Sequence, residues 1–128
     1  MWVNPDEEDT TVQYALLIHQ GTSPLPDTDA WAALSQEEQT EIYAQYAALN
    51  RDERITPGMP LGLPAAAQTV RVENGAAVTA AGSYHDDPVA GMMLVDVDDV
   101  EAAIEIAARV PAARLGGTVE VRPVEKYW

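Results

Sequence analysis

Four side chains in this 128-residue chain have the chemistry of a small acid–base site: His19, Tyr84, His85 and Asp86. An imidazole exchanges protons near neutral pH, a carboxylate can orient it, and a phenol can donate a hydrogen bond to a developing oxyanion. In this interpretation His19 is the general acid or base, and Asp86 or Asp87 orients its ring. The alternative is that His19 ends a strand with its ring bonded to a backbone group, and that His85 is simply exposed.

A metal site finds little support in the same residues. Two histidines and a carboxylate can bind iron, but adjacent residues such as His85, Asp86 and Asp87 seldom direct their side chains at one ion. The carboxylates at 96–99 lack the glycine and the distal glutamate of an EF-hand, so they are interpreted as strand-end and helix-capping groups. The chain has no cysteine, phosphate-binding glycine loop or dinucleotide fingerprint. We therefore expect no metal and no cofactor.

The charge of the chain restricts its partners. Seven basic residues stand against 21 acidic ones, which gives a formal net charge of −14. A nucleic-acid-binding protein needs lysine and arginine to release counterions, so we expect neither nucleic acid nor an anionic membrane as partner. The sequence has no apolar run of about 18 residues and no basic leader before an apolar stretch, which predicts neither a transmembrane segment nor a secretory signal. A cytoplasmic location is expected.

The elements that position the candidate residues are predicted to form one domain. Residues 1–11 are an acidic leader without periodicity, and residues 12–128 have the length and apolar content of a single α+β domain with its own core. A strand is predicted at 12–18, where consecutive apolar residues indicate burial on both faces. His19 follows at its end.

A first helix is predicted from a capping box. Ser35 is its N-cap, Glu38 completes the box, and the helix reaches about Arg54. Its core-facing positions recur at helical spacing, as Ile42, Tyr46 and Leu49.

The middle of the chain predicts an irregular segment and a hairpin. Three prolines and two glycines within 56–64 exclude a central strand and leave a loop or an irregular edge segment. Two strands, at 68–73 and 76–80, flank Asn74-Gly75, which tolerates the positive φ angles of a two-residue hairpin turn.

The last third reads as a strand, a helix and a strand. An apolar strand at 92–97 is followed by a predicted capping box of Asp98 and Glu101. Gly116-Gly117 then leads into a strand at 118–124. The expected helix face consists of Val100, Ala103, Ile104, Ala107 and Ala108.

This element order predicts a ferredoxin-like sandwich with an extra hairpin. Both helices of such a fold cover one face of the sheet, yet the strands at 12–18 and 92–97 are apolar on consecutive positions. A second copy of the sheet would cover the other face, so we expect a homodimer that forms a dimeric α+β barrel.

Several segments carry a family resemblance. They are Gln-Tyr-Ala-Leu-Leu-Ile-His at 13–19, Trp-Ala-Ala-Leu-Ser at 31–35, Thr-Val-Arg-Val at 69–72, Val-Asp-Val-Asp-Asp at 95–99 and Val-Glu-Val-Arg-Pro-Val at 119–124. In this order and spacing they resemble YCII-related (DGPF-domain) proteins. The resemblance implies the same dimeric α+β barrel.

The chain departs from that family at its signature. Ala81-Gly82-Ser83-Tyr84 stands where the family has Asp-Gly-Pro-Phe. Some family members have a proposed catalytic His/Asp pair with its histidine on the first helix, where this chain has no histidine. Neither the signature nor that pair can therefore be assigned to this chain.

The preferred interpretation is a small protein that binds a small molecule in a pocket of the dimeric barrel. The six candidate pocket residues are aromatic or thioether side chains, which core packing would also explain: Trp31, Tyr43, Tyr46, Met59, Met92 and Met93. One alternative is a cofactor-independent acid–base enzyme of the lyase, isomerase or oxygenase type that uses His19. The other is a structural or regulatory partner protein without catalysis.

Overall fold

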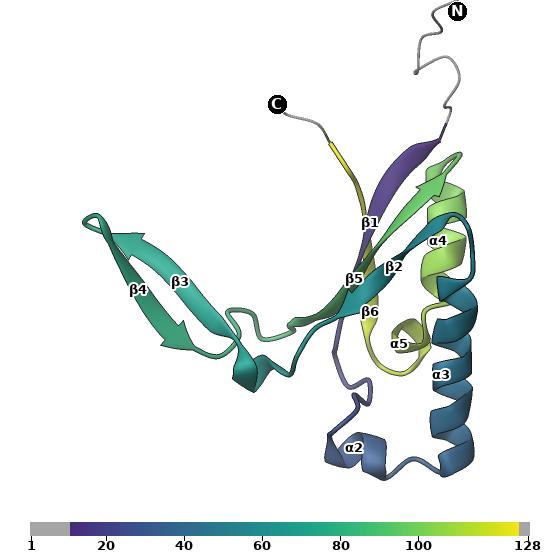
Figure 1. Ribbon diagram of the computed structural model, residues 1–128, viewed down its shortest axis with the longest axis horizontal. Coiled ribbons are helices and arrows are strands. Elements are labelled where there is room, and N and C mark those ends of the chain that lie inside the picture. Colours follow the sequence, from purple (N-terminus) through teal and green to yellow (C-terminus); the bar gives the residue numbers. More distant parts are fainter. Residues whose placement is uncertain (1–10, 126–128) are drawn as a thin grey trace, which may run out of the picture.

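The computed structural model describes residues 11–125, so the predicted leader at residues 1–11 lies, apart from Thr11, outside the described part. A four-stranded antiparallel sheet is covered on one face by helices (Figure 1). The strands, in the sheet order β2-β5-β1-β6, are β2 (Ile55–Pro60), β5 (Val89–Val97), β1 (Val12–His19) and β6 (Thr118–Pro123). The helical elements are α2 (Asp29–Ala32), α3 (Gln36–Asn50), η1 (Pro64–Ala66), α4 (Val100–Ala108) and α5 (Pro111–Arg114). The predicted ferredoxin-like α+β fold is confirmed.

The core lies between the sheet and the helices. Leu16 and Ile18 of β1 alternate toward the helices, as do Met93 and Val95 of β5, and all four are buried. Leu49, Ile106 and Val110 meet them from the helical layer. The intervening strand residues therefore face the side of the sheet that no helix covers.

The first helix begins as predicted and ends earlier. Ser35 Oγ accepts a hydrogen bond from Glu38 N at 3.1 Å, and Glu38 Oε1 accepts one from Ser35 N at 3.0 Å. The expected end near Arg54 was wrong, because α3 stops at Asn50. Asp52 Oδ1 accepts from the backbone N–H of Arg54 at 3.0 Å, and this local side-chain contact turns the chain into β2.

The cap of α4 is also corrected. Asp99, and not Asp98, is the N-cap, since its Oδ1 accepts from Ala102 N at 2.9 Å. The buried face of α4 agrees in part with the predicted one, since Ala103 and Ala107 are buried as expected and Ile106 is buried with them. Of the expected face, Ile104 is instead 53% exposed and Val100 is 39% exposed.

The inserted hairpin matches its prediction. β3 (Gln68–Glu73) and β4 (Ala76–Ala81) pair around Asn74 and Gly75, which have φ angles of 52° and 79°. Figure 1 shows the hairpin projecting away from the sandwich. Within the described residues, the two strands of the hairpin make extensive contacts only with each other.

β2 is the irregular edge segment that its prolines predicted. It lies at the edge of the sheet, and its pairing with β5 is interrupted between Thr56 and Met59. Among the described residues, no helix combines the length and the apolar character needed to cross a membrane.

Candidate functional site

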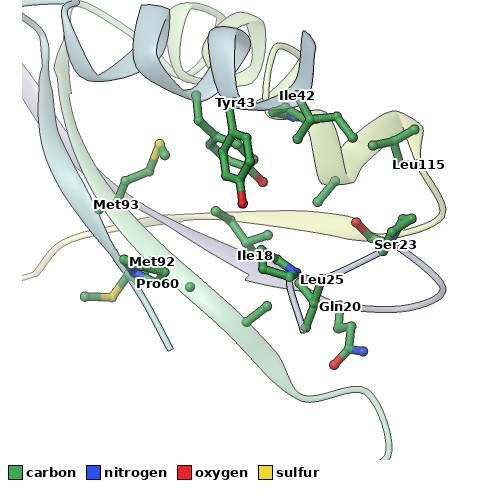
Figure 2. Close-up of a pocket in the computed structure, with 18 of the residues that line it drawn as sticks. Ile18, Gln20, Ser23, Leu25, Ile42, Tyr43, Pro60, Met92, Met93 and Leu115 are labelled. Carbon is green, nitrogen blue, oxygen red and sulfur yellow. The ribbon is translucent and has the colours of Figure 1, made fainter. Parts of the chain in front are cut away.

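A cavity of about 330 Å³ opens between α3, one end of the sheet and the loop after β1 (Figure 2). Figure 2 shows Tyr43 reaching down from α3 toward Ile18 on the sheet, with Ser23 and Leu25 on the loop beside them. The aromatic and thioether residues singled out from the sequence all contribute atoms to its lining: Trp31, Tyr43, Tyr46, Met59, Met92 and Met93. Of the three methionines, Met93 lies on the helix-facing side of the sheet, while Met59 and Met92 pair opposite each other on the other side.

Two glycines, Gly58 and Gly91, line the cavity. Gly91 lies on the helix-facing side of β5 and leaves empty the space that a side chain there would fill. A Cβ added to it would lie 3.4 Å from the carbonyl oxygen of Met59 and 3.9 Å from Ile18 Cδ1, which are ordinary contacts. At Gly58 a Cβ would lie 2.5 Å from the carbonyl oxygen of Met92, so this glycine is what lets β2 approach β5.

Local interactions of α2 fix the aromatic side of the cavity. Thr28 Oγ1 accepts a hydrogen bond from Trp31 N at 3.3 Å, and Gln39 Nε2 donates to the carbonyl oxygen of Trp31 at 2.9 Å. The rings of Trp31 and Tyr43 then meet edge to face, with centroids 5.2 Å apart. The aromatic wall is therefore held before any ligand arrives.

Three residues with a hydroxyl group line this apolar space: Ser23, Tyr43 and Tyr46. Ser23 is only 7% exposed, and its side-chain hydroxyl has no hydrogen-bond partner within residues 11–125. Burial raises the pKa of Tyr46, and a hydrogen bond with the Ala112 backbone only partly opposes the effect. The Tyr46 phenol is therefore protonated at neutral pH.

His19 lies outside this cavity, at the end of β1. Its Nδ1 is 3.1 Å from the carbonyl oxygen of Asp87, and its Nε2 is 3.4 Å from Glu120 Oε1. Glu120 is on the helix-free face, because it pairs opposite Leu17. The Asp87 carbonyl is the main cause that raises the pKa of His19, burial opposes it, and the Glu120 carboxylate adds to the increase.

Asp87, rather than Asp86, ties the loop before β5 to the end of β1. Its Oδ1 accepts from the backbone N–H of Gly21 at 2.7 Å, while its carbonyl oxygen faces His19. Asp86 is exposed and, within residues 11–125, contacts neither histidine through a hydrogen bond or an ion pair.

Tyr84 and His85 are placed together at the base of the hairpin. Their rings meet edge to face with centroids 5.1 Å apart, and both line a second, more open hollow with Leu61 and Val89. Tyr84 is 73% exposed. The structure thus brings His19 to Asp87 and Tyr84 to His85, but neither of the two hollows is lined by both pairs.

The described residues contain no group of three His, Asp or Glu side chains placed to hold a metal ion. Sequence reasoning missed Glu120, Ser23 and Gly91. The alternation of β6 places Glu120 on the opposite face from Val119 and Val121, but its partner follows only from the strand register. Nothing in the local sequence indicates the roles of Ser23 and Gly91.

The chain is thus a small α+β domain with a ferredoxin-like topology, an inserted hairpin and an apolar cavity under α3. The family of YCII-related domains matches residues 12–127, and the chain belongs to that family. Among curated proteins, no match to the chain is found.

Proposed function

We propose that this YCII-related protein binds a small molecule in the cavity under α3 and does so as a homodimer. The observation that carries the proposal is the cavity itself. Its volume of about 330 Å³ falls within the usual range for small-molecule sites. Its walls combine mostly apolar side chains with a few polar groups, which is the usual composition of such sites.

The lining of the cavity favours binding over acid–base catalysis. Within the described residues, its titratable groups are the phenols of Tyr43 and Tyr46. The raised pKa of Tyr46 keeps that phenol protonated, so it can donate a hydrogen bond but cannot accept a proton near pH 7.

The helix-free face of the sheet supports the homodimer. Ala15 pairs opposite Leu94, and Leu17 pairs opposite Met92, which puts four apolar side chains next to one another on that face. No described helix covers them. A second copy presents the same apolar surface, so an isologous contact would bury both at once.

An acid–base enzyme is the second candidate, and the surroundings of His19 favour it. A raised pKa keeps a larger share of this imidazole protonated near neutrality, as a general acid requires. Its substrate would lie on the helix-free face, beside Glu120 and away from the cavity. A protein partner without catalysis is the third candidate.

Filling the cavity tests the binding proposal. Gly91→Val introduces a side chain where a Cβ meets only ordinary contacts, so the fold should be kept while the cavity shrinks. Gly62→Val is the matched control, because Gly62 lines the second hollow and has a single neighbour at 3.9 Å.

A panel of neutral, anionic and cationic one- and two-ring compounds is screened by ligand-observed NMR against the three proteins. We expect binders of the wild type that Gly91→Val loses and Gly62→Val keeps. The proposal is overturned by an absence of binders at millimolar concentration, or by binders that depend on Gly62 instead.

A further inference from the structure

We infer that the ligand is an uncharged, flat molecule of one or two rings that carries a hydrogen-bonding group for the hydroxyl of Ser23. This inference rests on the proposed binding function and names its ligand class. It follows from four properties of the cavity: its charge, its nearest cations, its size and its unpartnered hydroxyl.

The cavity is uncharged in a strongly charged protein. The chain has 21 acidic and seven basic residues, yet the described residues that line the cavity include no Asp, Glu, Lys, Arg or His. A charged ligand would give up its hydration without meeting an opposite charge, which is unfavourable in an apolar site. Nucleotides, phosphate esters and carboxylates are therefore poor candidates.

Two arginines are adjacent in sequence to the cavity wall: Arg51, which follows the lining residue Asn50 and is exposed without lining the cavity, and Arg114, which lies between the lining residues Ala112 and Leu115. The guanidinium of Arg114 donates instead to Gln45 Oε1 on α3, and its side chain is exposed and does not line the cavity. Arg114 therefore provides no positive charge inside the cavity that could pair with an anionic ligand.

The size and walls of the cavity favour ring compounds. A cavity of about 150 Å³ is large enough to hold benzene, and this one has about 330 Å³. Trp31 and Tyr43 offer aromatic faces and edges, and the thioether of Met93 is a soft, polarisable contact for a ring. One or two fused rings fit this space.

The Ser23 hydroxyl marks where a polar group of the ligand belongs. Ser23 is the buried polar residue of the described chain, its hydroxyl lacks a partner there, and Figure 2 shows it at the edge of the cavity. Within residues 11–125 no buried side-chain oxygen or nitrogen lacks a partner, so the oxygen of this hydroxyl is open to the cavity. A polar group of the ligand can there replace water as its hydrogen-bond partner. The hydroxyl can donate or accept.

The test compares probes of one shape and different charge by calorimetric titration of the whole chain at pH 7: 2-naphthol, 2-naphthoate and 2-naphthylmethylammonium. We expect 2-naphthol to bind at least about a hundredfold more tightly than either ion. Failure of all three to bind would defeat the binding proposal itself. Preferential binding of one ion would leave binding intact and overturn the ligand class.

Two variants test the inference further, one at the Ser23 hydroxyl and one that adds a charge to the cavity wall. Ser23→Ala should weaken the binding of 2-naphthol about fivefold and leave the binding of 2-methylnaphthalene unchanged, because only 2-naphthol can form a hydrogen bond with the Ser23 hydroxyl. An equal loss for both probes, or no loss for 2-naphthol, contradicts the role of Ser23.

Leu25→Lys places a cation on the cavity wall and should strengthen the binding of 2-naphthoate at least about tenfold. Leu61→Lys, at the second hollow, should not. If both lysines strengthen 2-naphthoate equally, the anion binds elsewhere and the ligand class loses this support.

Discussion

The imidazole Nδ1 of His19 lies 3.1 Å from the backbone carbonyl oxygen of Asp87, 68 positions along the chain. A carbonyl oxygen can only accept, so Nδ1 carries the proton. The lone pair of a neutral ring would then be on Nε2 and face the Glu120 carboxylate at 3.4 Å. The bond to the Asp87 carbonyl is the main reason why the ring favours its charged form, and protonation of Nε2 adds to it by turning the repulsive contact with Glu120 into an ion pair.

His19 is expected to titrate above its ordinary pKa of 6.5. NMR titration of the two imidazoles checks this, and a His85→Gln variant assigns the signals. A His19 pKa at or below 6.5 would contradict the contacts with Asp87 and Glu120.

The same shift predicts how stability depends on pH. A pKa raised by folding stabilises the native state fully below the unfolded value near 6.5, and this contribution is lost as the pH rises through the folded pKa. His19→Gln should therefore destabilise the protein at pH 5.5 and do so less at pH 8.5, in urea unfolding. A difference in unfolding free energy between wild type and His19→Gln that grows with pH would contradict this prediction.

Asp52 links the ends of α3 and α4. Its carboxylate accepts from Arg54 Nε and Nη2 at 3.1 and 2.8 Å and lies 3.5 Å from Arg109 Nη1, contacts that hold the pKa of Asp52 well below its usual range. Both arginines are partly exposed, so solvent screening limits the loss in Asp52→Asn to about 1 kcal/mol at pH 7.

The pH dependence for Asp52 has the opposite sign to that of His19. A lowered pKa stabilises the fold above the unfolded pKa of 3.8, so the difference in unfolding free energy between wild type and Asp52→Asn should narrow as the pH falls below about 4. Urea unfolding at pH 7 and pH 3.5 measures it. Glu53→Gln, which removes an exposed carboxylate next in sequence, is the control and should change stability little.

Substitutions of two neighbouring aspartates, Asp98 and Asp99, test which of them is the N-cap of α4. Asp99→Ala should cost about 1 kcal/mol of unfolding free energy, since the N–H of Ala102 loses its acceptor. Asp98→Ala should cost clearly less. Equal costs, measured by chemical denaturation, would restore Asp98 as a capping residue.

Leu94→Asp tests the proposed homodimer. Leu94 is on the helix-free face, and a carboxylate buried there against a second copy would have no partner, which costs several kcal/mol. Sedimentation velocity at micromolar concentration should show a wild-type dimer and a folded Leu94→Asp monomer. Ile104→Asp, on the exposed side of α4, should stay dimeric. A monomeric wild type would rule out the dimeric barrel.

The sequence predicts this fold best where a signal is local. The Ser35–Glu38 box and the Asn74-Gly75 turn each depend on a few adjacent residues, and both are observed. The adjacent carboxylates of Asp98 and Asp99 are locally equivalent, and only the docked helix distinguishes them.

The site was less predictable because it depends on long-range pairing. Glu120 meets His19 only through the register of β6 on β1. The cavity depends on a side chain that is missing at Gly91, and on how α3 stands above it. The aromatic and thioether residues could be named from their types, but their convergence follows from the topology.

The most direct test of the account is to observe the cavity while a neutral ring compound is added. Met93 lines it from the helix-facing side of β5, and its methyl group can be labelled with ¹³C and followed by NMR during a titration with 2-naphthol. The account predicts saturable shifts of the Met93 methyl signal, which ring currents make large, and their loss in Gly91→Val. A Met93 signal that stays in place at saturating 2-naphthol, or one that shifts equally in Gly91→Val, would contradict a ligand site under α3.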